Sequence, residues 1–217
     1  MPGNTLGVLG GGQLGRMFVH AAQRMGYRTV VLDPDADSPA GRASDVHLAC
    51  GYLDEKGLQT LARQAAGITT EFENVPAQAL AELARTRPVS PAADAVSIAQ
   101  DRALEKAHFT RCQVPVAPHA VLRSSDDLAQ VNDRLLPGIL KTATLGYDGK
   151  GQVRVRTRDE LLAGWTQLQG RATQPVVCVL EQMLPLAAEC SVIVARGRDG
   201  QMVNLPVQRN LHHDGIL

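Results

Sequence analysis

A glycine-rich stretch near the N-terminus constrains the fold of this chain more than any other feature. The sequence LGVLGGGQLGRM places Gly10, Gly12 and Gly15 in the pattern Gly-x-Gly-x-x-Gly, directly after a short apolar run, and Asp33 follows 18 residues after the last glycine. This spacing is typical of a strand–turn–helix unit whose backbone amides hold an anion at the helix N-terminus. Three interpretations stay open: a dinucleotide, another phosphate-bearing ligand, or a tight turn that only packs the helix against the strand. Asp33 can hold a ribose hydroxyl, although aspartates that start a loop are common without any ligand.

The composition excludes several classes of function. The formal net charge is zero and the aromatic residues are one Trp, three Tyr and three Phe, so we expect no nucleic-acid partner. No apolar run reaches the roughly 18 residues of a membrane span. The start, MPGNTLGVLG, has no basic leader, so we expect neither a membrane anchor nor a secretory signal. Four cysteines without a CxxC pair indicate small core residues in a reducing cytoplasm.

Hydrophobic periodicity predicts alternating strands and helices over residues 1–100. Strands are expected at about residues 6–9, 27–32, 45–50 and 67–72, and helices after the glycines, at about residues 54–66 and after Pro76. The first helix is expected to have an apolar face formed by Leu14, Met17, Phe18, Ala21 and Ala22. Repeated units of this length indicate an α/β fold with a parallel sheet and helices on both of its faces.

The pattern changes after about residue 100 to a smaller α+β unit. Its expected elements are a helix at 101–111, a strand at 120–122, a helix opened by Ser124-x-x-Asp127, a hairpin of strands at 138–144 and 152–156, a helix opened by Thr157-x-x-Glu160, and a strand at 176–182. Two more strands, 189–196 and 201–207, are expected to meet at a turn. The expected domains are therefore 1–100, 101–180 and 181–217, the last being the beginning of a larger domain.

The tip of the expected hairpin, GYDGKG, is a second candidate ligand loop. It spans residues 146–151, and Lys141 lies in the strand that leads into it. It is not a Walker A loop, because neither Ser nor Thr follows Lys150. A glycine-rich tip with flanking lysines can fold over a triphosphate. A plain hairpin turn explains the same residues equally well.

Acidic and imidazole side chains mark two further positions. Glu71 and Glu73 follow a predicted parallel strand, at the edge where open α/β sheets bind ligands, and they would point the same way if the strand continued. A solvated acidic loop is the alternative. His212 and His213 are adjacent and would face opposite sides of an extended segment, so we do not expect a metal-binding pair.

Several motifs occur in one order along the chain: GGGQLGRM, TTEFENVP, AQDRALEK, GYDGKGQ, LEQ and NLHHDGIL. Together they resemble the N5-carboxyaminoimidazole ribonucleotide synthetases, a family of ATP-grasp enzymes in purine biosynthesis, over nearly the whole chain. The resemblance implies a Rossmann-like preATP-grasp domain, a small α+β ATP-grasp subdomain and the start of a truncated larger ATP-grasp domain. It also implies that the first glycine loop serves an aminoimidazole ribonucleotide rather than a dinucleotide.

The resemblance further implies which residues form the site. Those matching the contacts of the substrate, 5-aminoimidazole ribonucleotide, are Gln13, Leu14, Glu71, Glu73, Tyr147 and Lys150. Those matching ATP contacts are Arg102, Lys141, Gly146, Tyr147, Asp148, Gly149, Lys150, Gly151, Gln152, Glu181, Gln182, Met183, Leu184, Glu189 and His212. The residues expected to act in catalysis are Lys141, Lys150 and His212.

The implied reaction is an ATP- and Mg2+-dependent carboxylation. Bicarbonate attacks the γ-phosphate to give carboxyphosphate, and the exocyclic amine of the ribonucleotide then takes the carboxyl group. The implied enzyme is a homodimer. The family's Mg2+ ligands fall after the motif that contains His212, so we expect none within this chain and expect the 217-residue chain to be inactive alone.

Three alternatives stay open from the sequence. An NAD-dependent oxidoreductase would use the first glycine loop, but leaves GYDGKG and LEQ unexplained. A non-catalytic nucleotide-binding fragment would bind ligand without turnover. A neighbouring ATP-grasp enzyme, similar to the formate-dependent glycinamide ribonucleotide transformylase, fits less well because GYDGKG and NLHHDGIL favour the carboxylating family.

Overall fold

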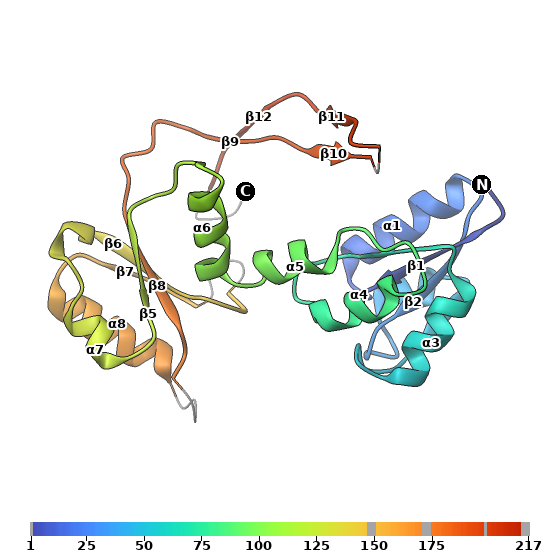
Figure 1. Cartoon of the computed structure of the whole chain (residues 1–217), viewed down its shortest axis with the longest axis horizontal. Coiled ribbons are helices and arrows are strands. Elements are labelled where there is room, and N and C mark those ends of the chain that lie inside the picture. The colour runs from blue at the N-terminus through green and yellow to red at the C-terminus, as the bar shows by residue number, and fades with distance from the viewer. Residues whose placement is uncertain (1, 147–150, 171–174, 198, 214–217) are drawn as a thin grey trace. The chain divides into compact units, whose positions relative to one another are not determined.

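The chain folds into two compact units, Met1–Cys112 and Gln113–Leu217, in a computed structural model (Figure 1). The structure describes residues 2–146, 151–170, 175–197 and 199–213. Each unit has its own sheet and its own apolar core, so each is described by itself.

The first unit is built on a four-stranded parallel sheet with the order β3-β2-β1-β4. Its strands are β1 (Thr5–Leu9), β2 (Arg28–Leu32), β3 (Val46–Leu48) and β4 (Gly67–Thr70). Its helices are α1 (Gln13–Arg24), α2 (Pro39–Ala43), α3 (Glu55–Gln64), α4 (Ala77–Ala84), α5 (Ala93–Ala99) and α6 (Arg102–Arg111). The predicted α/β class is therefore confirmed, with α2 and α5 as helices that we did not predict.

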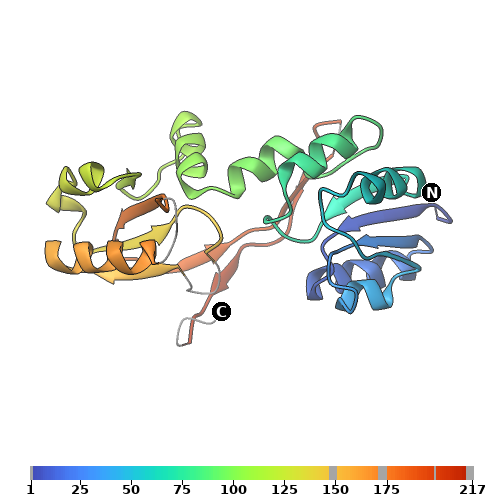
Figure 2. The ribbon, with the colours of Figure 1, turned by 90° about the horizontal axis from the view of Figure 1, so that it is seen from below.

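Helices cover both faces of this sheet, as Figure 2 shows. Alternate strand residues point to opposite faces, so Leu9 packs with α3 and α4, whereas its neighbour Val8 packs with α1 and α2. The larger core cluster consists of Leu9, Val30, Leu32, Leu58, Leu61, Ala65, Ile68, Val75, Ala79, Leu80, Leu83 and Val96. This core fixes the carboxyl ends of the strands along one edge, where the loops that carry the candidate site begin.

The apolar face predicted for α1 is only partly confirmed, because Ala22 is buried and Phe18 packs against the core but the other three residues are exposed. Leu14 and Met17 are 61% and 67% exposed, and the buried face consists of Gly15, Val19 and Ala22. The cause is a close approach at Gly15, where an added Cβ would lie 2.7 Å from a backbone oxygen of the preceding loop. The glycine must therefore face the sheet, and this rotation turns Leu14 and Met17 outward.

The second unit contains a four-stranded antiparallel sheet with the order β5-β8-β6-β7. Its strands are β5 (His119–Leu122), β6 (Gly138–Thr142), β7 (Gln152–Val155) and β8 (Cys178–Gln182). Its helical elements are α7 (Ser125–Ala129), the 3-10 helix η1 (Asp133–Leu135) and α8 (Arg158–Gln169). The predicted β6–β7 hairpin is confirmed.

Both helices predicted to open at Ser124 and at Thr157 begin there, each with that side chain as its N-cap. The Ser124 side chain accepts from the backbone N–H of Asp127, and the Thr157 side chain accepts from the backbone N–H of Glu160. The Glu160 carboxylate in turn accepts from the backbone N–H of Arg156 at 2.7 Å. These bonds satisfy amides at each helix start that would otherwise have no partner, which explains why α7 and α8 begin where they do.

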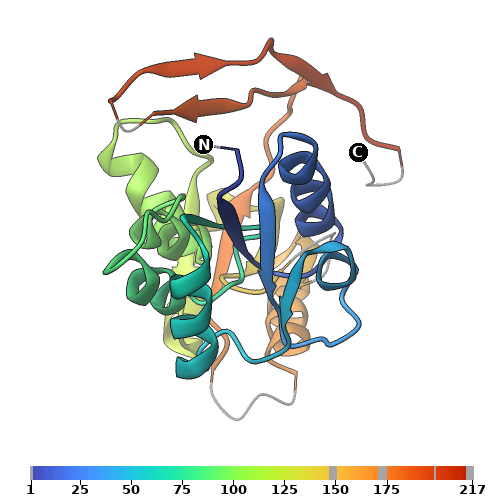
Figure 3. The same ribbon diagram turned by 90° about the vertical axis from the view of Figure 1, so that its right-hand side faces the viewer.

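Two short ladders follow β8. They consist of β9 (Glu189–Ser191), β10 (Val194–Arg196), β11 (Met202–Asn204) and β12 (Gln208–Asn210). β10 pairs with β11 and β9 pairs with β12, both antiparallel, so the two segments run side by side as predicted, with a break between the ladders (Figure 3). Their apolar side chains are exposed, among them Ile193 at 57% and Val203 at 68%. We call residues 189–210 the apolar ribbon.

The cysteines only partly match the expectation of small core residues. All four are free; Cys178 is buried and Cys50 is partly buried, but Cys112 and Cys190 are exposed. No helix in the described part of the chain combines the length and the apolar character that a membrane span requires.

Candidate functional site

The order of the parallel strands locates a ligand crevice in the first unit. The chain runs from β1 outward to β2 and β3, and then crosses to β4 on the other side of β1. The carboxyl ends of β1 and β4 therefore form a topological switch point, where open α/β sheets bind their ligands. The glycine loop follows β1 and Glu71 follows β4, and a hydrogen bond of 3.0 Å from the Glu71 N–H to the Leu9 carbonyl joins the two ends.

Glu71 closes the glycine loop. Its carboxylate accepts from the backbone N–H of Gly12 at 2.7 Å and from the backbone N–H of Gly15. The N-cap of α1 is Gly12, which has no side chain to cap the helix, so Glu71 supplies the negative charge that the positive end of the helix dipole favours. A phosphate at these two amides would have to displace Glu71. The geometry therefore disfavours the dinucleotide interpretation of the motif.

Asp33 is also engaged within the protein. It is 7% exposed and accepts from the backbone N–H of Gly11 at 2.7 Å, from the backbone N–H of Asp35 at 2.9 Å and from the Tyr52 hydroxyl at 2.6 Å. Burial, followed by the bond to Asp33, raises the pKa of Tyr52, which keeps its hydroxyl a donor. The free ribose-binding carboxylate considered for Asp33 is not found.

The other residues of this unit that we expected at the substrate, Gln13, Leu14 and Glu73, also lie near the carboxyl edge of the parallel sheet. Gln13 and Leu14 are exposed in the first turn of α1, beside the amides bound by Glu71. Glu73 is exposed, and its carbonyl accepts from the Gln100 side chain at 2.5 Å. The strand β4 ends at Thr70, before either glutamate. The alternation of side chains along a strand therefore does not make Glu71 and Glu73 point the same way.

In the second unit, Lys141 and Glu181 form an ion pair. Lys141 stands opposite Val179 in the β6–β8 ladder, so Glu181 is its diagonal neighbour on the same face of the sheet. Their Nζ and Oε2 atoms are 3.0 Å apart, and the side chains are only 23% and 16% exposed. Partial burial reduces screening by water. The structure thus brings together Lys141, expected at the phosphates of ATP, and Glu181, expected at its nucleoside.

Residues at the end of β8 and just after it form hydrogen bonds through both side chain and backbone. Gln182 donates its side-chain N–H to the Arg134 carbonyl at 3.1 Å, and the Met183 N–H donates to the Pro137 carbonyl at 2.9 Å. The side chains of Met183 and Leu184 are partly exposed. Apolar side chains beside a carboxylate are suitable for the face and the edge of a purine base.

The apolar ribbon brings a third pair together. The Glu189 carboxylate accepts from the Asn210 side chain at 2.9 Å and lies 3.7 Å from His212 Nε2. The pairing of β9 with β12 causes this approach, because it sets Glu189 opposite Asn210. Both members of the His212–Glu189 pair are about half exposed, so each has room for a ligand.

The structure describes only the residues on either side of the glycine-rich hairpin tip. Tyr147, Asp148, Gly149 and Lys150 lie outside the described residues. Gly151 has a φ of +70°, which favours glycine, and its carbonyl accepts from the Thr142 N–H at 2.8 Å, which closes the base of the hairpin. Gly146 is partly buried and Gln152 is exposed, each beside the tip.

Arg102 is the first residue of α6, the last helix of the first unit. The Asp101 carboxylate caps this helix by accepting from the backbone N–H groups of Ala103 and Leu104. The cap fixes where the helix starts, and therefore where the Arg102 guanidinium originates.

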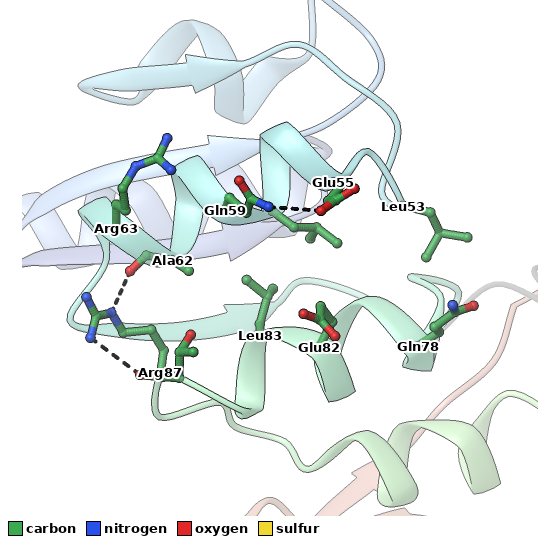
Figure 4. A pocket seen from close by; sticks show the side chains of 11 residues that line it. Leu53, Glu55, Gln59, Ala62, Arg63, Gln78, Glu82, Leu83 and Arg87 are labelled. Carbon is green, nitrogen blue, oxygen red and sulfur yellow. Dashed lines mark hydrogen bonds between the residues drawn. The ribbon is translucent and has the colours of Figure 1, made fainter.

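A pocket of about 620 Å³ lies elsewhere in the first unit, between α3 and α4 (Figure 4). Leu58, Ala62 and Leu83 line it, with Glu55 and Arg63 among the charged residues, and no predicted site residue takes part. Among the described residues, no group of three or more His, Cys, Asp or Glu side chains could hold a metal ion.

Sequence reasoning missed Tyr52 and the internal partner of the glycine loop. Tyr52 belongs to no motif; the available signal is its place just after a strand of the parallel sheet, at the edge where ligands bind. The role of Glu71 as a helix cap has no local signal, since 56 residues separate it from Gly15.

Comparison with known proteins places both units. A family model described as the ribonucleotide synthetase preATP-grasp domain matches residues 3–100, and a model of the ATP-grasp domain matches residues 107–217. The N5-carboxyaminoimidazole ribonucleotide synthase of Brucella melitensis is 41% identical over 217 residues, which cover 100% of this chain and 59% of that protein.

Solved structures agree with this similarity. The N5-carboxyaminoimidazole synthetase of Staphylococcus aureus complexed with ADP matches with a TM-score of 0.90 and 36% identity, over 99% of this chain and 56% of that one. The N5-carboxyaminoimidazole synthase of Aspergillus clavatus in complex with ADP and 5-aminoimidazole ribonucleotide matches with a TM-score of 0.82 and 27% identity, over 99% and 55% of the two chains. The chain spans a little over half the length of these relatives.

Proposed function

Because this chain belongs to the ATP-grasp family, we propose that it is the ribonucleotide- and ATP-binding part of an N5-carboxyaminoimidazole ribonucleotide synthase. The observation that carries the proposal is the closure of the glycine loop by Glu71. A carboxylate has about four acceptor positions, so two remain for hydroxyl or amine donors after the two amides are bound. A ribonucleotide offers such donors, whereas a pyrophosphate offers none.

The reaction has two steps in this proposal. An oxygen of bicarbonate attacks the γ-phosphorus of ATP, the bond to the β-phosphate oxygen breaks, and ADP leaves. The exocyclic amine of 5-aminoimidazole ribonucleotide then attacks the carboxyl carbon of carboxyphosphate, either directly or after CO2 forms in place. The product is N5-carboxyaminoimidazole ribonucleotide, phosphate leaves, and the amine nitrogen loses one proton.

We assign the ATP contacts chiefly to the second unit. Lys141, with Lys150 of the hairpin tip, offsets negative charge on the phosphoryl group in flight, as does Arg102 of α6. Glu181, held by Lys141, accepts from the ribose or base of ATP, and the residues from Gln182 to Leu184 line the nucleoside. Covering of the phosphates by the glycine-rich tip would exclude water, which otherwise hydrolyses carboxyphosphate.

Glu189 and His212 complete the assignment. Their approach to 3.7 Å makes Glu189 a group that orients the imidazole rather than a nucleophile. Gln13, Leu14, Glu71 and Glu73, with Tyr147 and Lys150 of the tip, are assigned to the ribonucleotide. We infer Mg2+ as the metal of the whole enzyme, but the described residues do not form a site that fits it, so no step here involves the metal.

We also propose the organisation of the whole enzyme. The domains are 1–100, 101–180 and 181–217, with the last belonging to a larger ATP-grasp domain. The enzyme is a cytoplasmic homodimer that uses bicarbonate as the source of carbon. An exposed apolar ribbon supports the larger domain, because apolar strands of this kind pack against further strands or helices.

The test is an assay of ADP release by the complete gene product with ATP and Mg2+. We expect turnover to require both 5-aminoimidazole ribonucleotide and bicarbonate. Formate with glycinamide ribonucleotide should not replace them, and NADH should not bind at concentrations that saturate ATP. Turnover with formate and glycinamide ribonucleotide, or tight NADH binding without ADP release, would reject the proposal.

A further inference from the structure

One buried carboxylate joins three loops at the carboxyl edge of the parallel sheet. Asp33 accepts from Gly11 in the loop after β1, from Asp35 in the loop after β2, and from Tyr52 in the loop after β3. The loop after β4 contributes Glu71, which binds the next residue of the glycine loop, Gly12. The backbone N–H groups of Gly11 and Gly12, which are neighbours in the glycine loop, therefore link the loop after β1 to the other three loops.

The strand register holds Asp33 in this place. Its own N–H donates to the Leu48 carbonyl of β3 at 3.2 Å, and the preceding carbonyl, of Leu32, accepts from Gly10 at 3.0 Å. Asp33 is thus fixed on both sides by neighbouring strands. With 7% of its surface exposed and both oxygens engaged, it is poorly placed to contact a ligand directly.

The space around Gly11 shows that its position is closely defined. An added Cβ there would lie 2.7 Å from the Asp33 carboxyl carbon and would also contact the Ser38 hydroxyl. The Gly11 carbonyl accepts from Ala40 at 2.8 Å, so Gly11 is held by both its donor and its acceptor. A shift at Gly11 would move Gly12, and with it the first turn of α1.

We propose that Asp33 is a positioning residue for the ribonucleotide site, acting with Tyr52 through Gly11. By fixing Gly11, the pair sets the two amides that Glu71 binds and the turn that presents Gln13 and Leu14. The role rests on the proposed function, since it is the ribonucleotide that meets this turn. The Tyr52 hydroxyl serves as a donor, and its raised pKa keeps it protonated across the working range of pH.

Two substitutions probe the pair with little change of shape. In Asp33→Asn, the amide group cannot accept from Gly11 and Asp35 at once, because one of its two ends is an NH2 donor. Tyr52→Phe removes one donor and leaves both backbone bonds to Asp33 in place. The matched control is Asp35→Asn, because the exposed Asp35 side chain accepts from the Asp37 N–H at 2.9 Å, its one partner within the described part of the chain, while its backbone N–H still donates to Asp33.

The experiment is steady-state kinetics of the complete gene product, with the KM for 5-aminoimidazole ribonucleotide and the KM for ATP measured separately. We expect Asp33→Asn to raise the KM for the ribonucleotide about tenfold or more, and Tyr52→Phe about two- to tenfold, the range for one lost hydrogen bond. The KM for ATP should change less than twofold in each, and Asp35→Asn should resemble the wild type.

The outcomes separate this role from a merely structural one. An unchanged KM for the ribonucleotide in folded Asp33→Asn, or an equal rise for both substrates, overturns the proposal. If Asp33→Asn does not fold, Tyr52→Phe decides by the same comparison. If the wild-type enzyme shows no ribonucleotide-dependent turnover, the proposed function is overturned, and this inference with it. If the wild type turns over and the variants have the wild-type KM for the ribonucleotide, only the role of Asp33 is overturned.

Discussion

Removal of the Glu71 carboxylate should destabilise the first unit and create a new anion site. The carboxylate accepts from two amides at the start of a helix that has no other side-chain cap. Hydrogen bonds to charged groups contribute roughly 1.5–3 kcal/mol each, while loss of a helix cap costs about 0.5–2 kcal/mol. Glu71 is only partly buried, so water can replace part of the loss. We therefore expect Glu71→Ala to lower the free energy of unfolding by about 2 kcal/mol.

The assay is urea denaturation of the 217-residue chain, followed by far-UV circular dichroism, in phosphate and in chloride at equal ionic strength. Phosphate should restore part of the stability of Glu71→Ala and leave the wild type unchanged, because the freed amides at the start of α1 can bind an anion. The neighbouring variant Glu73→Ala is the control, since Glu73 is exposed. Wild-type stability of Glu71→Ala, or equal stabilisation of both proteins by phosphate, would refute the closure of the loop.

Other consequences can be measured in parallel. Lys141→Met should weaken ATP binding of the complete enzyme about tenfold or more by titration calorimetry, whereas Lys56→Met, at an exposed position of α3 in the first unit, should not. A hydrogen bond from the Thr29 backbone is the main cause of the lowered pKa of Asp45. The ionised carboxylate therefore stabilises the fold above its ordinary pKa near 3.8, and this stability is lost as the pH falls through the lowered value. In urea denaturation at a series of pH values, Asp45→Asn should reduce the fall of the midpoint at acid pH. The 217-residue chain should self-associate in sedimentation experiments, and paired Ile193→Asp and Val203→Asp substitutions should reduce this, because both side chains are exposed on the apolar ribbon.

Local signals were enough to predict much of the fold. The strands of both units, the hairpin of β6 and β7, and the starts of α7 and α8 follow from apolar periodicity, glycine turns and capping residues, each of which acts over a few residues. Ser124 and Thr157 illustrate this, because each hydrogen bond joins residues three apart. Such contacts form wherever the short pattern occurs and depend little on the rest of the chain.

Features that depend on distant contacts were missed. The rotation of α1 is set by the packing of Gly15 against the preceding loop, and apolar periodicity alone placed Leu14 and Met17 on the buried face although both are exposed. Tyr52 approaches Asp33 from a loop 19 residues away. No local pattern predicts which of several polar groups will meet at the edge of a sheet.

The residues of the candidate site could be predicted from the sequence, but their contacts with one another could not. Lys141 and Glu181 were each expected at the nucleotide, but their 3.0 Å pairing follows from the antiparallel register of β6 and β8. Likewise, His212 approaches Glu189 because β12 pairs with β9. Motif order supplied the identities of these residues, and strand pairing supplied their geometry.

The glycine motif shows why spacing alone could not identify its ligand. A Gly-x-Gly-x-x-Gly turn provides donors at the start of a helix, and the spacing says nothing about which acceptor takes them. Here two carboxylates of the protein do so: Asp33 at Gly11, and Glu71 at Gly12 and Gly15. A turn that normally attracts phosphate thereby presents the remaining acceptor positions of the Glu71 carboxylate instead. It should then favour hydroxyl and amine donors, and a phosphate brought close to Glu71 would meet like charge.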